Sequence, residues 1–167
     1  GNLANGSPIG DGAPVLMALD ATLVLQRGSR ERRVRLDAFY LDYMKNQLAE
    51  GEFVAALRVP LPAPAQQLRA YKISKRFDQD ISATVCAMSY ELVGDKFKNV
   101  KLAFNGLAPY PCRAPKLEAI LAGNTPASVE NEALDAAITA SFPARDGLRA
   151  TWAYRSLVAR NLVMQFV

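Results

Sequence analysis

The stretch SATVCAMSYELVGDKFKNVKLAFN, residues 82–105, decides the fold of this chain. Residues 99–105 alternate along an extended strand, which places Val100, Leu102 and Phe104 on one side. The other side carries Lys101, Ala103 and Asn105. Gly94-Asp95 separates this strand from the apolar run over 82–93, and such a pair is typical of a tight antiparallel turn. The stretch therefore predicts a β-hairpin with one covered face.

Strand and helix signals flank the hairpin. An extended segment at 70–75 precedes it, and helical periodicity follows at 115–122, 126–142 and 148–166. Gly123 and Pro143 are stop signals for the first two helices. The third repeats apolar residues on one stripe, namely Tyr154, Leu157, Val158 and Leu162. We therefore expect an α+β fold, with helices packed on one face of an antiparallel three-stranded sheet.

The first part of the chain carries shorter elements. Turn formers occupy almost every position of residues 1–12, which predicts a loop. Pro14 can begin a helical turn, and residues 21–26 and 32–37 have the composition of two strands around a turn at Gly28-Ser29. Residues 53–59 are extended again, and proline and alanine dominate a connector at 61–67.

Composition restricts the class of protein. The chain has 167 residues, 50% of them apolar and 22% charged, which is the balance of a folded globular protein. Its densest basic run, residues 27–35, holds five arginines and one glutamate beside an expected turn, so we interpret it as a solvated hairpin tip and expect no nucleic acid partner. No leader and no apolar run of about 18 residues is visible, so we expect no membrane span and a cytoplasmic location.

The inventory of reactive side chains is poor. Histidine is absent, which excludes His-based acid–base catalysis and leaves no plausible zinc or non-haem iron site. Cys86 and Cys112 lie far apart in apolar surroundings, which predicts buried thiols. Any redox chemistry must therefore use a reactive group that the chain itself does not supply, such as a cofactor. The sequence also opens at Gly1 without an initiator methionine, from which we expect a processed or truncated product.

The opening loop is the first candidate site. Its glycines permit close approach of backbone N–H groups, and Asn2, Asn5, Ser7 and Asp11 add polar side chains. Such a set suits a polyhydroxylated or phosphorylated ligand, because a carboxylate such as that of Asp11 accepts hydrogen bonds from sugar or ribityl hydroxyls. The alternative is an ordinary surface loop.

The second candidate is YKISKRFDQDIS, residues 71–82, where a basic strand end meets an acidic turn. If this segment flanks a cofactor, Lys72 could place positive charge near a flavin ring and stabilise the negative charge of its reduced form. The alternative is an exposed connector with local ion pairs among Lys75, Arg76, Asp78 and Asp80.

Four segments carry a resemblance to a known family. GNLANGSPIGD (1–11) resembles the flavin-contacting loop of the FAD-binding subunit or domain of the xanthine dehydrogenase and molybdenum hydroxylase family. YKISKRFDQDISA (71–83) is similar to the strand and turn that lead into the family's C-terminal flavoprotein domain, and EFVAALRVPLP (52–62) and FNGLAPYPCRA (104–114) follow the same order. Within the family, the chain looks most like the small subunit of bacterial xanthine dehydrogenase.

The resemblance implies a set of site residues. Residues 1–60 would be the C-terminal part of the FAD-binding domain, and residues 68–167 would be the C-terminal domain found in CO dehydrogenase flavoproteins. FAD contacts carry over to Gly1, Asn2, Asp11, Val54 and Lys72, and less directly to Asn5 and Ser7. Tyr43 and Lys45 match a region near the nicotinamide approach, although Met44 stands where the family often has a basic residue.

The resemblance also implies a route for electrons. They would pass from a molybdenum centre through two [2Fe–2S] clusters to FAD and then to NAD, as in purine catabolism. The partners would be an upstream iron–sulfur and FAD portion of the same subunit and a separate molybdopterin-binding subunit. Because the family's phosphate-binding glycine loop and cluster cysteines lie upstream of this sequence, we expect the chain alone to bind FAD poorly.

Two alternatives stay open. The chain could belong to a related hydroxylase, such as an aldehyde, nicotinate or carbon monoxide dehydrogenase, whose substrate is set in the molybdenum subunit. It could also be a packing and assembly module without a ligand, which an exposed apolar patch on the sheet or the last helix would favour.

Overall fold

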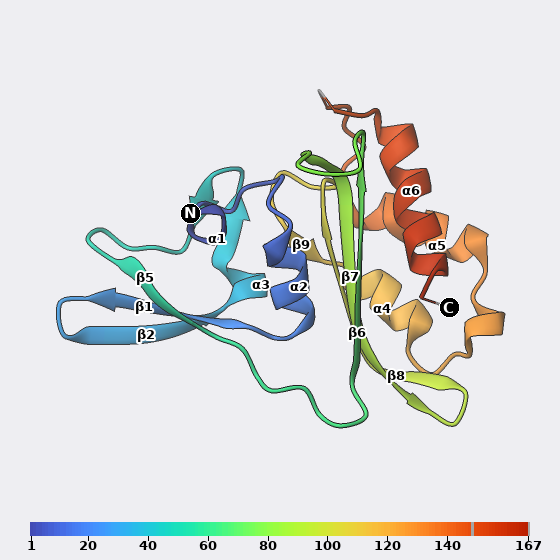
Figure 1. The fold of residues 1–167 in the computed structure, drawn as a ribbon, viewed down its shortest axis with the longest axis horizontal. Helices are drawn as coiled ribbons and strands as arrows, with labels where there is room; N and C mark the ends of the chain where they lie inside the picture. The colour runs from blue at the N-terminus through green and yellow to red at the C-terminus, as the bar shows by residue number, and fades with distance from the viewer. Residues whose placement is uncertain (148, 167) are drawn as a thin grey trace.

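The protein contains two antiparallel sheets that lie side by side, seen in a computed structural model that describes residues 1–147 and 149–166 (Figure 1). The strand order is β2-β1-β5 in the N-terminal sheet and β6-β7-β8-β9 in the C-terminal sheet, and a two-stranded ribbon of β3 and β4 accompanies the first. The α+β class is therefore confirmed.

The C-terminal sheet is built on the expected hairpin. Val93 pairs with Lys96 across the turn at Gly94-Asp95, and the pairing continues back to Val85 and Asn105. The sheet has one strand more than expected, because the two-residue β9 pairs with the end of β8. Its strands are β6 (Gln67–Ser74), β7 (Ser82–Val93), β8 (Lys96–Asn105) and β9 (Cys112–Arg113).

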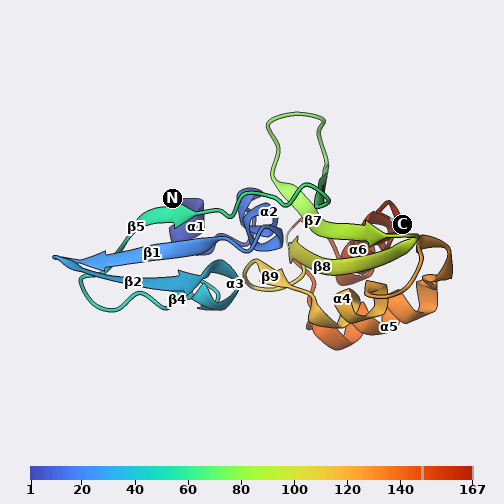
Figure 2. The ribbon, with the colours of Figure 1, turned by 90° about the horizontal axis from the view of Figure 1, so that it is seen from below.

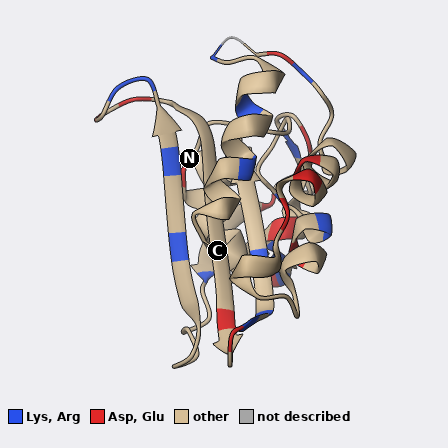
Figure 3. Cartoon of the chain, turned by 90° about the vertical axis from the view of Figure 1, so that its right-hand side faces the viewer, with Lys and Arg blue, Asp and Glu red and all other residues tan. Residues whose placement is uncertain are grey.

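Three helices cover one face of this sheet, as Figure 2 shows from below. They are α4 (Pro115–Leu121), α5 (Asn131–Ser141) and α6 (Trp152–Met164), with a 3₁₀ turn at Pro126–Ser128. Phe97, Phe104, Leu117 and Leu134 are fully or almost fully buried between these layers, and burial of each such side chain stabilises the fold by roughly 1.5–3 kcal/mol. In this layer the charged positions of α6 are basic and those of α5 are acidic (Figure 3).

Two helix expectations need correction. The helix expected from Pro126 begins only at Asn131, because a 3₁₀ turn closed by reciprocal Thr125 and Ser128 hydrogen bonds intervenes. The buried face of the last helix was predicted only in part: Leu162 is buried and Val158 packs against the core as expected, whereas Tyr154 and Leu157 are 47% and 46% exposed and Ala159 and Val163 are buried instead. The expected start at 148 lies outside the described residues.

The opposite face of the C-terminal sheet is covered as well, contrary to the prediction of one covered face. Helix α2 (Gly12–Ala18) packs on β7 and β8, so Ala103 and Asn105 are buried together with the apolar residues of the other face. Ser89 of β7 donates a 2.6 Å hydrogen bond to the carbonyl of Ala18 at the helix end. Sequence alternation failed here because an alanine and a short amide can face either solvent or a helix.

The N-terminal unit packs against the side of α2 that faces away from the C-terminal sheet. Its elements are α1 (Asn2–Asn5), β1 (Thr22–Arg27), β2 (Arg30–Arg35), α3 (Leu36–Phe39), β3 (Tyr40–Asp42), β4 (Lys45–Asn46) and β5 (Phe53–Arg58). The arginine-rich hairpin turns at Gly28 as expected, and its tip is exposed. Leu23 and Leu25 of β1 are fully buried under α2 and α3.

A cluster of ion pairs joins the two units. Asp20, just after α2, is bonded by Lys101 of β8 and lies 3.5 Å from a guanidinium nitrogen of Arg113 in β9. Arg113 also bonds Glu118 at 2.5 Å and approaches Asp37 at 3.8 Å. Opposite charges from both units meet in this cluster, so it links one sheet to the other.

No helix in residues 1–147 and 149–166 has the length and apolarity to span a bilayer.

Candidate functional site

The two candidate segments meet. Lys72 Nζ on β6 lies 2.7 Å from Oδ2 of Asp11, at the start of α2, and also donates a 2.8 Å hydrogen bond to the carbonyl of Asp80. Ser82, the first residue of β7, donates to the other oxygen of Asp11. The two candidates, 61 positions apart in sequence, therefore form one polar site at the junction of the units.

Both partners of the Asp11–Lys72 pair are partly exposed, with 45% and 39% of their side-chain surfaces accessible. The pair alone thus stabilises the fold by at most about 1 kcal/mol. A carboxylate offers about four lone-pair positions, so Asp11 can accept further hydrogen bonds beside those from Lys72 and Ser82. The geometry leaves the site open to a ligand that presents hydroxyl groups.

The opening segment is partly helical, which corrects the prediction of a loop throughout. One helical turn, α1, ends at Gly6, whose φ of +63° is in the left-handed region. Glycine is required there for two reasons: it adopts this backbone conformation without strain, and a Cβ would lie 2.8 Å from Cδ1 of Tyr40.

This turn uses backbone groups that were expected to be free. The N–H groups of Asn5, Gly6, Ser7 and Gly10 all donate to carbonyl oxygens within the segment. A ligand would therefore be held there chiefly by side chains and by the remaining backbone groups.

The β3–β4 ribbon and β8 hold this segment in place. Tyr40 donates from its hydroxyl to the carbonyl of Leu3 at 2.8 Å, and the amide of Asn46 donates to the carbonyl of Ala4 at 2.9 Å. Burial raises the pKa of the Tyr40 hydroxyl, so it stays a donor at any physiological pH. From the other side, the buried amide of Asn105 donates to the carbonyl of Gly10 at 2.8 Å. The segment is therefore anchored from both units.

A hollow of about 340 Å³ lies against the anchored segment, and three of the expected FAD-contacting residues line it: Gly1, Asn2 and Ser7. Asp11 stands between two further lining residues, Gly10 and Gly12. Asn5 is exposed and does not line the hollow. Val54 is not a lining residue either; it is half-buried on β5 and packs against the core beneath the sheet.

The expected connector ion pairs form only in part. Arg76 and Asp80 lie 3.7 Å apart, and the backbone N–H of Arg76 bonds the Asp80 carboxylate at 3.0 Å. These backbone hydrogen bonds lower the pKa of Asp80. Lys72 bonds both Asp11 and the carbonyl of Asp80, so it links this turn to the start of α2, and Phe77 at the tip is fully exposed.

Tyr43 and Met44 form the turn between β3 and β4, with Lys45 directly after it. Tyr43 and Met44 are 59% and 53% exposed, and Met44 adopts a φ of +54°.

Sequence reasoning missed three residues of the site: Ser82, Asn105 and Tyr40. Ser82 ends the second candidate segment and Asn105 stands at a strand end, but neither was given a role, and a hydroxyl or amide at a strand end gave the only signal for them. Tyr40 was noted as one aromatic among several, and its partner lies 37 positions away.

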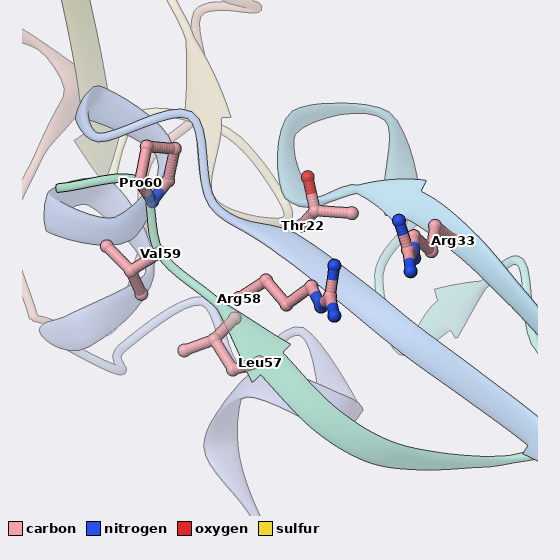
Figure 4. A pocket seen from close by; sticks show the side chains of 6 residues that line it. All are labelled: Thr22, Arg33, Leu57, Arg58, Val59 and Pro60. Carbon is pink, nitrogen blue, oxygen red and sulfur yellow. The ribbon is translucent and has the colours of Figure 1, made fainter.

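A larger hollow of about 600 Å³ lies elsewhere, on the outer face of the N-terminal sheet (Figure 4). Its lining residues are Thr22, Arg33, Leu57, Arg58, Val59 and Pro60, none of which the sequence suggested as a ligand contact. It shares no residue with the hollow at the opening segment.

Neither cysteine is poised for chemistry. Burial raises the pKa of the fully enclosed Cys86 thiol and raises that of Cys112 to about 12. Within the described part of the chain, His, Cys, Asp and Glu side chains form no group of three that could hold a metal ion.

Two family descriptions match nearly the whole chain. Residues 1–62 match the FAD binding domain in molybdopterin dehydrogenase, and residues 69–167 match the CO dehydrogenase flavoprotein C-terminal domain. The xanthine dehydrogenase of Emericella nidulans is 32% identical over 99% of this chain and 12% of its own length. The carbon monoxide dehydrogenase medium chain of Hydrogenophaga pseudoflava is 30% identical over 98% of this chain and 56% of its own length.

The fold agrees with these matches. The solved structure of Hydrogenophaga pseudoflava carbon monoxide dehydrogenase, in a form lacking the Mo-pyranopterin moiety, superposes with a TM-score of 0.86 at 27% identity. That match covers 99% of this chain and 57% of the other, so the chain spans little more than half of that subunit. The chain belongs to the FAD-binding subunits and domains of the xanthine dehydrogenase and molybdenum hydroxylase family.

Proposed function

We propose that this chain forms the wall of a flavin site in the FAD subunit of a xanthine dehydrogenase-type molybdenum hydroxylase. The observation that carries the proposal is the contact of Lys72 with Asp11, which joins the opening segment to the second unit. A site at such a junction suits a cofactor that lies between domains.

The donor set fits FAD. At the hollow, Asn2 supplies an amide and Ser7 a hydroxyl. Asp11 supplies a carboxylate next to the lining residues Gly10 and Gly12, and the ammonium group of Lys72 bonds that carboxylate. Hydroxyl groups of the ribityl chain are matched by such acceptors and donors. Gly10 keeps the wall thin, since a Cβ there would lie 3.2 Å from Cβ of Asn2. In this proposal Gly1 contributes backbone and Val54 an apolar surface, while Asn5 has the weakest claim.

The residues of the chain have separable tasks. Asp11 binds hydroxyl groups and at the same time partly neutralises Lys72, while Ser82 fixes the carboxylate in one orientation. Lys72 stabilises negative charge that develops on a nearby ring system. Bound FAD would supply the redox chemistry, namely the transfer of electrons from iron–sulfur centres to an acceptor.

The finer assignment follows the family. We propose that residues 1–60 complete an FAD-binding domain and residues 68–167 form its C-terminal companion. The [2Fe–2S] clusters and the molybdopterin would lie in other parts of a cytoplasmic complex, with xanthine as the substrate and NAD as the acceptor. Tyr43 and Lys45, exposed at the β3–β4 turn, would then lie on the approach of NAD.

The test uses the complete FAD subunit and measures the flavin reduction potential. Replacement Lys72→Ala should lower the potential by about 20 mV, because about 1 kcal/mol of charge stabilisation corresponds to that shift for a two-electron couple. Replacement Asp11→Asn should raise it, since the lysine charge is then unmasked. Lys75→Ala is the matched control, because Lys75 is exposed on the same segment. Equal potentials in all four proteins would refute the role of this pair.

One observation favours a second function, that of an assembly module without a cofactor. Tyr154 and Leu157 expose apolar surface on the outer side of α6, which is typical of a docking site for another polypeptide. An absorbance spectrum distinguishes the two functions. If the correctly folded complete subunit is mixed with excess FAD, separated from unbound FAD and found to be colourless, only the assembly-module function remains.

A further inference from the structure

Two arginines share the outer face of the N-terminal sheet. Thr22 of β1 pairs directly with Arg58 of β5, and Val24 pairs with Arg33 of β2. Paired residues of an antiparallel sheet point to the same face, and so do residues two positions apart in a strand. Arg33 and Arg58 therefore approach each other from opposite edges, across β1, over the position of Thr22. Figure 4 shows both guanidinium groups directed into the same space.

Arg32 and Arg35 of this sheet have carboxylate partners, whereas Arg33, Arg58, Arg27 and Arg30 have none among residues 1–147 and 149–166. Arg32 bonds Glu52 through two nitrogens, at 2.8 and 2.7 Å, and Arg35 bonds Asp37 in the same manner. Two like charges on one face repel each other, and an anion between them would relieve that repulsion.

The surroundings select the kind of anion. The hollow is shallow and open to solvent, with a volume of about 600 Å³. Thr22 adds a hydroxyl, while Val59 and Pro60 form an apolar wall at the end of β5. Two planar guanidinium forks and a hydroxyl complement the several oxygens of a phosphoryl group, and the apolar wall can receive the uncharged remainder of a ligand.

We propose that Arg33, Arg58 and Thr22 bind the phosphoryl group of a small ligand on the outer face of the N-terminal sheet. This site is separate from the flavin site of the proposed function, because the hollows share no residue. The proposed phosphoryl site is therefore independent of the proposed flavin site.

The test titrates the purified protein with inorganic pyrophosphate in a calorimeter at low ionic strength. Arg33→Gln and Arg58→Gln should each weaken binding by about tenfold or more, because each removes a charge-assisted hydrogen-bonding fork. Arg30→Gln is the matched control, since Arg30 is exposed in the same hairpin but does not line the hollow. It should bind pyrophosphate as the unaltered protein does.

Three results would overturn the proposal: no binding of pyrophosphate, equal weakening by Arg30→Gln, or equally tight binding of malonate, which offers two carboxylates in place of phosphoryl oxygens. Thermal unfolding of each ligand-free variant checks that the fold is retained, and we expect it to be because both side chains are exposed. The double variant Arg33→Lys/Arg58→Lys keeps the charge and loses the forks, so it should bind more weakly than the unaltered protein and more tightly than the glutamine variants.

Discussion

Replacement of Gly106 by alanine tests the packing on which the polar site depends. Gly106 follows β8 with a φ of +90°, and a Cβ placed on it would lie 2.3 Å from the carbonyl oxygen of Ala83 in β7. The left-handed conformation costs a residue with a Cβ about 1–3 kcal/mol. The clash is with backbone, which cannot rotate away, so β7 must also shift. We expect Gly106→Ala to lower the free energy of unfolding by about 3 kcal/mol or more.

Urea unfolding followed by circular dichroism measures this loss, and Gly94→Ala is its matched control. Gly94 has a similar backbone conformation, with a φ of +64°, but no atom lies within 4 Å of a Cβ placed there. That variant should lose only the conformational cost, about 1–2 kcal/mol. If the two variants unfold at the same urea concentration, the close approach of Gly106 to Ala83 does not matter and the reasoning is refuted.

The same variant should also disturb the site. The N–H of Gly106 donates to the side chain of Asn105, whose amide in turn holds Gly10, and Ala83 directly follows Ser82. A shift of either strand therefore moves the groups that fix Asp11. In the complete subunit, Gly106→Ala should weaken FAD binding more than Gly94→Ala does, measured by flavin fluorescence.

Three further outcomes follow from single contacts. Tyr40→Phe removes the hydrogen bond to Leu3 and should cost about 1 kcal/mol in urea unfolding, with faster amide exchange in residues 1–7. Hydrogen bonds, chiefly those from Arg32, lower the pKa of Glu52 from 4.5 to about 2. As the pH falls, Glu52 is therefore protonated in the unfolded chain before it is protonated in the folded one, and the free energy of unfolding should decrease between about pH 5 and pH 2. Glu52→Gln should make this pH dependence weaker. Asp20→Asn should lower the free energy of unfolding by about 1–3 kcal/mol, whereas Asp135→Asn, which breaks a more exposed pair, should cost under about 1 kcal/mol.

Local signals predicted most of the secondary structure. Strand β7 runs over 82–93 as expected, and the hairpin at Gly28-Ser29 and the helix over 115–121 lie within about two residues of their expected positions. Each of these has a mechanism confined to neighbouring residues, such as a glycine in the left-handed region or a proline in the first helical turn. The start of α5 was wrong because a capped 3₁₀ turn and a helix share the same signals over their first residues.

The faces of the elements were harder to predict than the elements themselves. Tyr154 and Leu157 were expected in the core and are exposed, because the sequence of α6 has apolar residues on more than one side. Only contact with β7 and α5 selects the side that carries Ala159, Leu162 and Val163. Conversely, Lys101 was expected to face solvent, and it reaches Asp20 across the junction of the units. Such choices depend on tertiary packing, which periodicity does not encode.

In the candidate site, too, residue types could be read from the sequence, whereas contacts between distant residues could not. Residue types alone indicated that residues 1–11 and the Lys72 segment could bind a polar ligand, and the family resemblance added that both contact the same cofactor. Neither source revealed that Ser82 completes the arrangement or that four N–H groups of the opening segment are already used. The first fact arises from a contact between the start of α2 and the start of β7, which lie far apart in the sequence, and the second from the local hydrogen bonds of α1 and the turn after it.

The docking of the sheets therefore controls the site more than any residue in it. The Asp11–Lys72 pair is exposed and weak, so it cannot hold two units together. Helix α2 can, because it is buried between both sheets and carries Asp11 at one end and Asp20 at the other. Loss of the Asp20 ion cluster should thus alter the position of Asp11 through a rigid helix of about 10 Å. A flavin potential that shifts in Asp20→Asn, in which Asp11 and Lys72 are intact, would separate this mechanical role from a purely local one.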